Sequence, residues 1–236
     1  MDLHEIVAPT MKELFIKEIE GKIISGEWKP GDKLPTEREM EKITRVSRTI
    51  INSALSEMAQ KGFVEIVPRK GVFVGDYTKH GQLDTLLAII NFNGGKLDKK
   101  TFRSLAEYRL LFDSECCALA AEHRTEKDLE NLKNIYTKMT SATEMEELLN
   151  LKFEFLHGIY YATGNNIYPL VCNSFKQVCY TFNKVIFTHF GFNVNELHIM
   201  ELINSIEKRD SEESRKIMNN YLTHKISEVS QVYFKD

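Results

Sequence analysis

The feature that most constrains this chain is the order of local patterns between residues 10 and 74, where three helical segments precede two short strands. In residues 10–25 apolar side chains recur at helical spacing, and Gly26 then favours a stop. Thr36 and Glu39 form a capping-box pair, which predicts the start of a second helix that reaches about Ile43. This order predicts a small domain built on closely spaced helices.

The second and third helices are separated by a break at residues 44–46. Ser47 follows as a good N-cap, and Gly62 is a plausible stop for the third helix. Two helices joined by a three-residue turn form a helix-turn-helix, whose second helix reads the major groove of DNA from its N-terminal end. Residues 63–67 and 72–74 flank a turn, so they predict a β-hairpin with a basic tip. The first domain is therefore predicted to be a winged helix-turn-helix of three helices and two strands.

A net charge of −3 gives the whole chain no attraction for nucleic acid, so any DNA contact must rest on a local basic patch. Arginine can bond guanine twice, asparagine prefers adenine, and hydroxyl groups reach phosphates or bases. A lone arginine is more often a solvated surface charge, but basic residues gather here at the start of the third helix and at the wing tip together. The candidate DNA-binding residues are Arg38, Arg45, Ser47, Arg48, Thr49, Asn52, Arg69, Lys70 and Gly71.

Beyond Tyr77 the chain contains few Gly or Pro residues and many segments of helical period, which predicts an all-α bundle of about seven helices. We therefore predict two domains, residues 1–77 and residues 78–236, and a mainly α fold. Two positions look like helix starts, at Thr125 and at Asp210. The predicted helices are 83–90, 101–123, 126–139, 145–162, 168–190, 197–208 and 211–234.

Composition narrows the class of protein further. No signal peptide and no apolar stretch of membrane-spanning length are evident, so we expect a cytoplasmic protein without a membrane partner. The four cysteines form no C-x-x-C pair, which favours buried thiols over a redox sensor. No nucleophile elbow, phosphate loop or H-E-x-x-H motif is present, so we do not expect an enzyme. A purely architectural or non-specific DNA-binding module is the remaining alternative.

Three segments carry a family resemblance: PGDKLPTERE, RVSRTII and KGFVEI followed by KGVFV. They resemble the winged-helix domain of the GntR family of bacterial transcription regulators. The second half resembles the FadR branch, through residues 108–121, 162–168 and 209–210. This resemblance implies a homodimeric regulator, usually a repressor, whose helical domain binds an effector and alters operator affinity. Two positions depart from the family: Arg45 stands where Gly is usual, and Asn52 stands where Arg is frequent.

Arg109 is the first candidate for the effector site, because it lies on an otherwise apolar helical segment. Asp113 follows four residues later, so an exposed intrahelical ion pair is one interpretation. The other is an inward-facing cation that binds an anionic metabolite, either a fatty acyl-CoA or a small organic acid. The aromatic run formed by Phe175, Tyr180, Phe182, Phe187, Phe190 and Phe192 is either core packing or an acyl-chain slot. The further candidate effector residues are His157, Asn165, Tyr180 and Tyr221.

Many relatives in this branch hold a divalent ion with one Asp and three His residues. The resemblance places those ligand positions on Lys152, Leu156, Ile199 and Tyr221, and a one-residue offset rotates a side chain by about 100° around a helix. We therefore predict no metal and no cofactor. A metal-dependent carboxylate-sensing regulator of the same family is the alternative, and its off-register histidines would be His157, His198 and His224.

Overall fold

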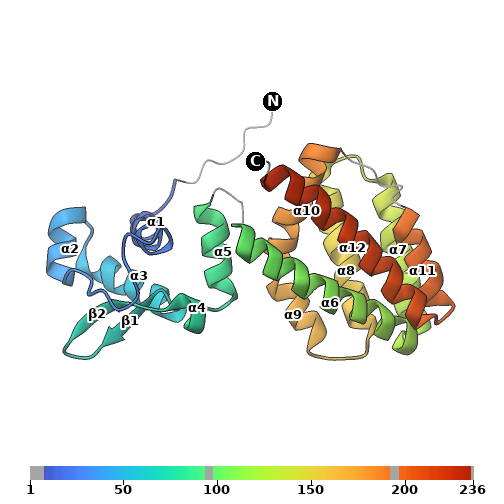
Figure 1. Ribbon diagram of the computed structural model, residues 1–236, viewed down its shortest axis with the longest axis horizontal. Helices are drawn as coiled ribbons and strands as arrows, with labels where there is room; N and C mark the ends of the chain where they lie inside the picture. Colours follow the sequence, from blue (N-terminus) through green and yellow to red (C-terminus); the bar gives the residue numbers. More distant parts are fainter. Residues whose placement is uncertain (1–7, 94–97, 192–196, 235–236) are drawn as a thin grey trace. The chain divides into compact units, whose positions relative to one another are not determined.

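A computed structural model describes residues 8–93, 98–191 and 197–234 (Figure 1). The chain forms two compact units, residues 1–96 and residues 97–236, and each is described by itself. The predicted fold class is confirmed, because the described residues are mainly helical with one two-stranded antiparallel sheet. Within the described ranges, none of the helices is long and apolar enough to pass through a bilayer.

In the first unit, three helices and a hairpin enclose one apolar core. The helices are α1 (Met11–Ile24), α2 (Glu37–Thr44) and α3 (Arg48–Gln60), and the strands are β1 (Val64–Val67) and β2 (Gly71–Val74). Both α1 and α2 begin with capping boxes, the second of them the predicted pair Thr36 and Glu39. The core residues with the least exposure include Phe15, Ile19, Ile23, Ile51, Leu55, Met58 and Phe63.

The end of α3 shows why the chain needs glycine at Gly62. Its φ is +76°, and a Cβ built there would lie 2.7 Å from the backbone oxygen of His80. The helix therefore ends at the predicted place, and the tight turn leads directly into β1. In the hairpin, Val64 is paired with Val74 and Val67 with Gly71, which confirms the predicted wing.

Two further helices, α4 (Tyr77–His80) and α5 (Leu83–Phe92), belong to the first compact unit. The Thr85 hydroxyl donates a 2.5 Å hydrogen bond to the backbone oxygen of Lys61 at the end of α3. The Phe92 ring lies so close to α1 that a Cβ on Gly21 would stand 3.0 Å from it. The compact units thus divide near residue 96, so α5 lies in the first unit, whereas the predicted boundary after residue 77 places it in the helical domain. The boundary between functional domains stays a prediction.

The second unit is a bundle of α6 (Lys99–His123), α7 (Glu126–Ser141), α8 (Met145–Ala162), α9 (Tyr168–Ser174), α10 (Lys176–Phe190), α11 (Leu197–Glu207) and α12 (Ser211–Tyr233). The long helices α6 and α12 pack side by side (Figure 1). Thr125 and Asp210 cap α7 and α12 as predicted. The prediction of a single helix over 168–190 is wrong, because Phe175, whose ψ is near 0°, separates this segment into α9 and α10.

Apolar and thiol side chains fill the interior of this bundle. Phe182 and Phe187 from the predicted aromatic run are buried, Phe190 is exposed, and Phe192 lies outside the described residues. All four cysteines are buried and free of disulfides. Burial raises the pKa of Cys116 to about 12, so the reactive thiolate is scarce at neutral pH. These features favour packing over redox chemistry for the thiols.

Candidate nucleic-acid interface and ligand cavity

All nine predicted DNA-binding residues are exposed on the first unit. They occupy three places: α2, the turn with the first part of α3, and the tip of the hairpin. Val46 is buried, and its backbone N–H donates to the Thr44 hydroxyl. Both contacts hold the turn against the core of the first unit. Ser47 has the backbone conformation of an N-cap, but the expected capping hydrogen bond is absent, so that part of the prediction is wrong. Its exposed hydroxyl faces solvent.

Arg45 has a left-handed backbone conformation, with φ of 58° and ψ of 21°, at the C-cap of α2. Non-glycine residues in this region cost roughly 1–2 kcal/mol, because Cβ crowds the following carbonyl oxygen. The departure from the family's usual Gly at this position is therefore a backbone strain as well as an added positive charge. The side chain of Arg45 is exposed beside the start of α3.

Arg48 is the first residue of α3, and Glu41 on α2 accepts a hydrogen bond from it. The Nε atom of Arg48 lies 2.7 Å from Oε2 of Glu41, and the side chains are 54% and 39% exposed. The backbone oxygen of the same Glu41 accepts the N–H of Arg45 at 2.9 Å. Glu41 therefore contacts both ends of the turn, once through its backbone and once through its carboxylate.

The wing tip also contains an arginine in the left-handed region. Lys70 N–H donates to the oxygen of Val67, which closes a turn with Pro68 and Arg69 at its centre. Arg69 has φ of +64°, a position in such turns that favours Gly or Asn. Gly71 follows with φ of +118°, and a Cβ there would lie 3.0 Å from the Lys33 side chain. The positive φ therefore favours glycine at this position, with the end of the Lys33 side chain lying against it.

A cleft of about 310 Å³ lies between the start of α2, the start of α3 and the wing. Four cationic side chains line it, and Glu37 is the acidic residue among its lining. The first helical turn of α2 adds the positive end of the helix dipole. Lys33 is the residue that sequence reasoning missed, because a single β-bridge to Phe73 brings it to the wing. The four cations are Lys33, Arg38, Arg48 and Lys70.

In the second unit, a small cavity of about 50 Å³ is enclosed by α6, α7, α8, α10, α11 and α12. Arg109 and Lys152 supply two positive charges to its lining, and no Asp or Glu is among the described residues that line it. Asn183, His198 and Tyr221 add polar groups, with the rings of His198 and Tyr221 stacked 3.7 Å apart. Two cationic and three other polar side chains thus line this cavity.

Arg109 is both paired within its helix and directed inward, so the two interpretations made from the sequence hold together: its ion pair with Asp113 is buried. The Arg109 Nε atom lies 2.9 Å from Oδ2 of Asp113, and the Tyr160 hydroxyl donates to the other carboxylate oxygen. Burial, and then the Asp113 charge, raise the pKa of Tyr160 far above its ordinary value, so it stays a hydrogen-bond donor. Arg109 also lies 5.2 Å from the centre of the Phe182 ring.

A second, smaller cavity of about 10 Å³ lies on another side of Arg109. Arg109 and Leu156 line both cavities, so they form part of the wall between them. Leu105, Phe175 and Val178 make this second space mainly apolar, and its volume suits about one water molecule. With volumes of about 50 and 10 Å³, neither cavity has room for a long acyl chain.

Of the five predicted effector residues, the structure brings Arg109 and Tyr221 together at the larger cavity. His157 is half-buried, and burial lowers its pKa. Asn165 forms a turn in which its side-chain oxygen accepts the Ile167 N–H, and burial together with the charge of Glu146 raises the pKa of Tyr180. These last three residues do not line either cavity. Lys152, Asn183 and His198 do line the larger one and were not among the predicted effector residues.

The four positions that correspond to metal ligands in relatives all line the larger cavity. Leu156 and Ile199 have no coordinating atom, and Lys152 carries a positive charge, so this donor set does not fit a divalent ion. The described residues contain no group of three or more His, Cys, Asp or Glu side chains suited to a metal. His224 is exposed and lies 3.2 Å from Glu228 on its own helix.

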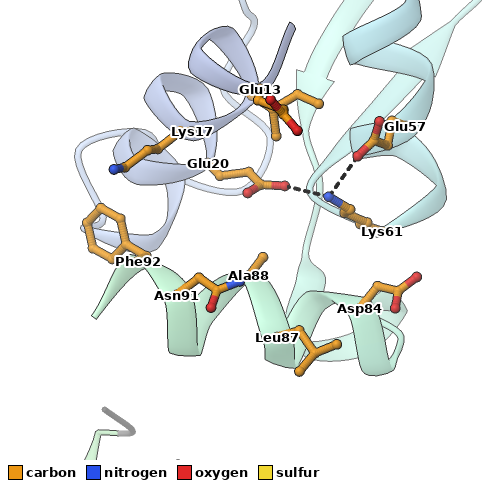
Figure 2. Close-up of a pocket in the computed structure, with 11 residues that line it drawn as sticks. Glu13, Lys17, Glu20, Glu57, Lys61, Asp84, Leu87, Ala88, Asn91 and Phe92 are labelled. Carbon is orange, nitrogen blue, oxygen red and sulfur yellow. Dashed lines mark hydrogen bonds and ion pairs between the residues drawn. The ribbon is translucent and has the colours of Figure 1, made fainter. Parts of the chain in front are cut away.

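Figure 2 shows a larger groove of about 420 Å³ in the first unit, between α1, α3 and α5. Lys61 lies at its centre, 3.4 Å from Glu20 and 3.0 Å from Glu57 (Figure 2). Burial raises the pKa of Glu20, whereas hydrogen bonds from Lys12 and Lys61 lower that of Glu57. The Glu20–Lys61 pair joins α1 to the end of α3, whereas Glu57 and Lys61 are four residues apart at that end.

The fold and these surfaces define a winged helix-turn-helix protein with an all-helical second unit that contains a cation-lined cavity. Two family models match it: "Bacterial regulatory proteins, gntR family" over residues 15–74 and "FCD domain" over residues 104–224. The chain belongs to the gntR family of bacterial regulatory proteins and has an FCD domain in its second half.

Curated relatives have the same class of description. The HTH-type transcriptional regulator Mce2R of Mycobacterium tuberculosis is 33% identical over 132 residues, which cover 56% of this chain and 54% of that protein. The fatty acid metabolism regulator protein of Proteus mirabilis is 29% identical over 151 residues, covering 62% and 60%. The match thus spans little more than half the length of these relatives. The solved structure of Lar of Listeria monocytogenes shares the fold, with a TM-score of 0.63, 17% identity and coverage of 96% and 100%.

Proposed function

We propose that this protein is a cytoplasmic transcription regulator that binds operator DNA as a homodimer and acts as a repressor. The observation that carries the proposal is the cleft of four cations between α2, α3 and the wing. A helix-turn-helix places the start of its second helix in the major groove, and cations beside it neutralise phosphates. Two-fold-related half-sites require two reading heads, which is the physical reason for a homodimer.

The effector we propose is a small organic acid bound in the larger cavity of the second unit. Arg109, Lys152 and Tyr221 would hold its carboxylate through charge-assisted hydrogen bonds. A relative is named for fatty acid metabolism, but the described cavity of about 50 Å³ favours a small acid over an acyl-CoA. The effector would change operator affinity only by binding the DNA-competent and DNA-incompetent states unequally.

A regulatory role is favoured over an enzymatic one because the named relatives are transcription regulators. The test is selection of bound duplexes from a random DNA library, followed by binding titrations at several salt concentrations. We expect enrichment of a two-fold-symmetric site, with affinity that falls steeply as salt rises. Equal affinity for selected and random DNA with weak salt dependence would instead indicate an architectural module.

A further inference from the structure

We propose that Glu41 is a positioning residue for base recognition, because it holds Arg48 in an orientation that reads guanine. This inference rests on the proposed operator binding. Glu41 and Arg48 are joined by a 2.7 Å hydrogen bond between Oε2 and Nε, across the turn of the helix-turn-helix. The Glu41 carboxylate is the acidic partner of a side chain that begins the recognition helix.

The ion pair contributes little to folding, because both side chains are substantially exposed. Exposed pairs of this kind typically contribute about 0–1 kcal/mol, since water and salt screen them. An acidic group beside DNA phosphates also weakens binding unless a cation compensates it. The placement of Glu41 is therefore better explained by what it does to Arg48 than by fold stability.

The geometry determines which donors of Arg48 point outward. Arginine has five N–H donors, and Glu41 occupies the one on Nε. The two terminal NH₂ groups then remain for the O6 and N7 acceptors of guanine, which arginine bonds as a pair. Because the Glu41 carboxylate already holds Nε, the orientation of Arg48 is set before DNA arrives. Preorganisation of this kind lowers the entropic cost of the specific contact.

The Glu41 charge also acts on non-specific DNA. Without a guanine in reach, Arg48 stays neutralised by Glu41 and attracts phosphates less strongly. With a guanine in place, the carboxylate is compensated by the same arginine that makes the base contacts. Glu41 should therefore raise the ratio of operator affinity to random-DNA affinity, and it should do so only while Arg48 is present.

The experiment compares Glu41→Ala, Arg48→Ala and the double variant in the full chain. Each is titrated with the selected operator, a scrambled duplex and the operator with 7-deazaguanine at the contacted guanine, which lacks the N7 acceptor. Glu41→Ala should lower the operator-to-scrambled ratio by about tenfold, a size within the range for one bidentate base contact. It should also lose most of the penalty that 7-deazaguanine imposes on the wild type, which a merely structural role would not change.

Glu65→Gln is the matched control, because Glu65 is an exposed carboxylate on β1 that does not line the cationic cleft and is not the partner of Arg48. It should raise affinity for both duplexes alike and leave their ratio unchanged. The proposal is overturned if Glu41→Ala keeps the wild-type ratio, or if its 7-deazaguanine penalty is undiminished. A wild-type ratio in Arg48→Ala would instead refute Arg48 as a base-reading residue, so the two failures are distinguishable. In the double variant the ratio should equal that of Arg48→Ala.

Discussion

Arg109 and Asp113 face each other inside the helical unit, one turn apart on α6, with Nε 2.9 Å from Oδ2. Asp113 is 1% exposed, and Tyr160 donates to its second oxygen. The Asp113 carboxylate thus neutralises the Arg109 charge that lines the larger cavity. An anion bound there would share Arg109 with Asp113. Any substitution of Arg109 therefore acts on fold stability as well as on ligand binding.

Arg109→Met alone should destabilise the second unit strongly, because it leaves the Asp113 carboxylate buried without its cation. Breaking such a pair typically costs about 3–5 kcal/mol. The double variant Arg109→Met with Asp113→Asn removes both charges and keeps an acceptor for Tyr160, so most of that loss should be recovered. Urea unfolding followed by circular dichroism measures both. Equal destabilisation in the single and double variants would show that the ion pair is not the cause.

Lys152→Met should abolish the response to small acids while leaving operator binding intact. Lys152 lines the larger cavity and lies 4.8 Å from the centre of the Phe187 ring, so methionine keeps the apolar contact and removes the charge. Thermal shifts would be measured with a panel of mono- and dicarboxylates, and separately with palmitoyl-CoA. Lys176→Met is the control, because Lys176 lies over the Phe153 ring but does not line the cavity. A stronger shift with palmitoyl-CoA than with any small acid would contradict the proposed effector class.

Arg45→Gly should stabilise the first unit and weaken DNA binding. Glycine adopts the left-handed conformation without crowding, so the gain is on the order of 0.5–1 kcal/mol after its larger unfolded-state entropy is subtracted. The lost charge should weaken operator affinity and, if Arg45 contacts a phosphate, reduce the salt slope by about one unit. Arg45→Ala separates the effects, since it loses the charge but keeps the strain. If the glycine variant proved no more stable than the alanine variant, φ of 58° would not be a strained position.

Lys33→Ala should weaken binding to operator and random DNA by similar factors. Its side chain lines the cationic cleft beside Gly71, a place suited to phosphate rather than base contact. The salt slope should fall by about one unit. Lys29→Ala is the matched control, because it is an exposed lysine of the same loop that does not line the cleft. Identical losses in both variants would indicate a general charge effect instead of a specific contact.

Glu20 and Glu57 should shift the pH dependence of stability in opposite directions. Burial raises the folded-state pKa of Glu20, so its stabilising contribution is complete below the unfolded pKa and is lost as pH rises through the folded one. Glu20→Gln, which resembles the protonated form, should therefore gain stability relative to wild type as pH rises from about 3 to about 7.

For Glu57 the sign is reversed, because hydrogen bonds from Lys12 and Lys61 lower its pKa. Its contribution is present above the unfolded pKa and lost as pH falls through the folded one. Glu57→Gln should be less stable than wild type near neutral pH, and the gap should close in acid. Urea midpoints across the pH range provide the test. Shifts of the same sign in both variants would rule out the opposing pKa changes.

Much of the first unit was predictable because its signals are local. Thr36 and Glu39 cap a helix whose start lies between them, and Gly62 ends α3 next to its own position, so each signal concerns the residues beside it. Lys33 was not predictable in the same way, since its place beside Gly71 depends on a bridge to a strand forty residues later. The left-handed φ of Arg45 was also not predictable, because glycine at a helix end indicates this conformation whereas arginine does not.

The second unit was predictable as helices but much less as a site. The four-residue spacing of Arg109 and Asp113 predicted that they could pair, but burial of the pair depends on which face α8 and α12 cover. The family register correctly grouped Lys152, Leu156, Ile199 and Tyr221, which line one cavity. Asn165 looked polar and available, yet its side chain caps a local turn. Cavity lining is a tertiary property, and helical periodicity alone does not determine it.

The left-handed arginines at positions 45 and 69 have a consequence for any attempt to improve this protein by selection. A screen that rewards only survival at high temperature would favour glycine at both places, because glycine relieves the backbone without disturbing the core. Each such gain would remove a cation from the turn or from the wing tip. Such a screen would therefore enrich well-folded variants that no longer recognise their DNA site. Thermal stability and DNA binding must be selected together.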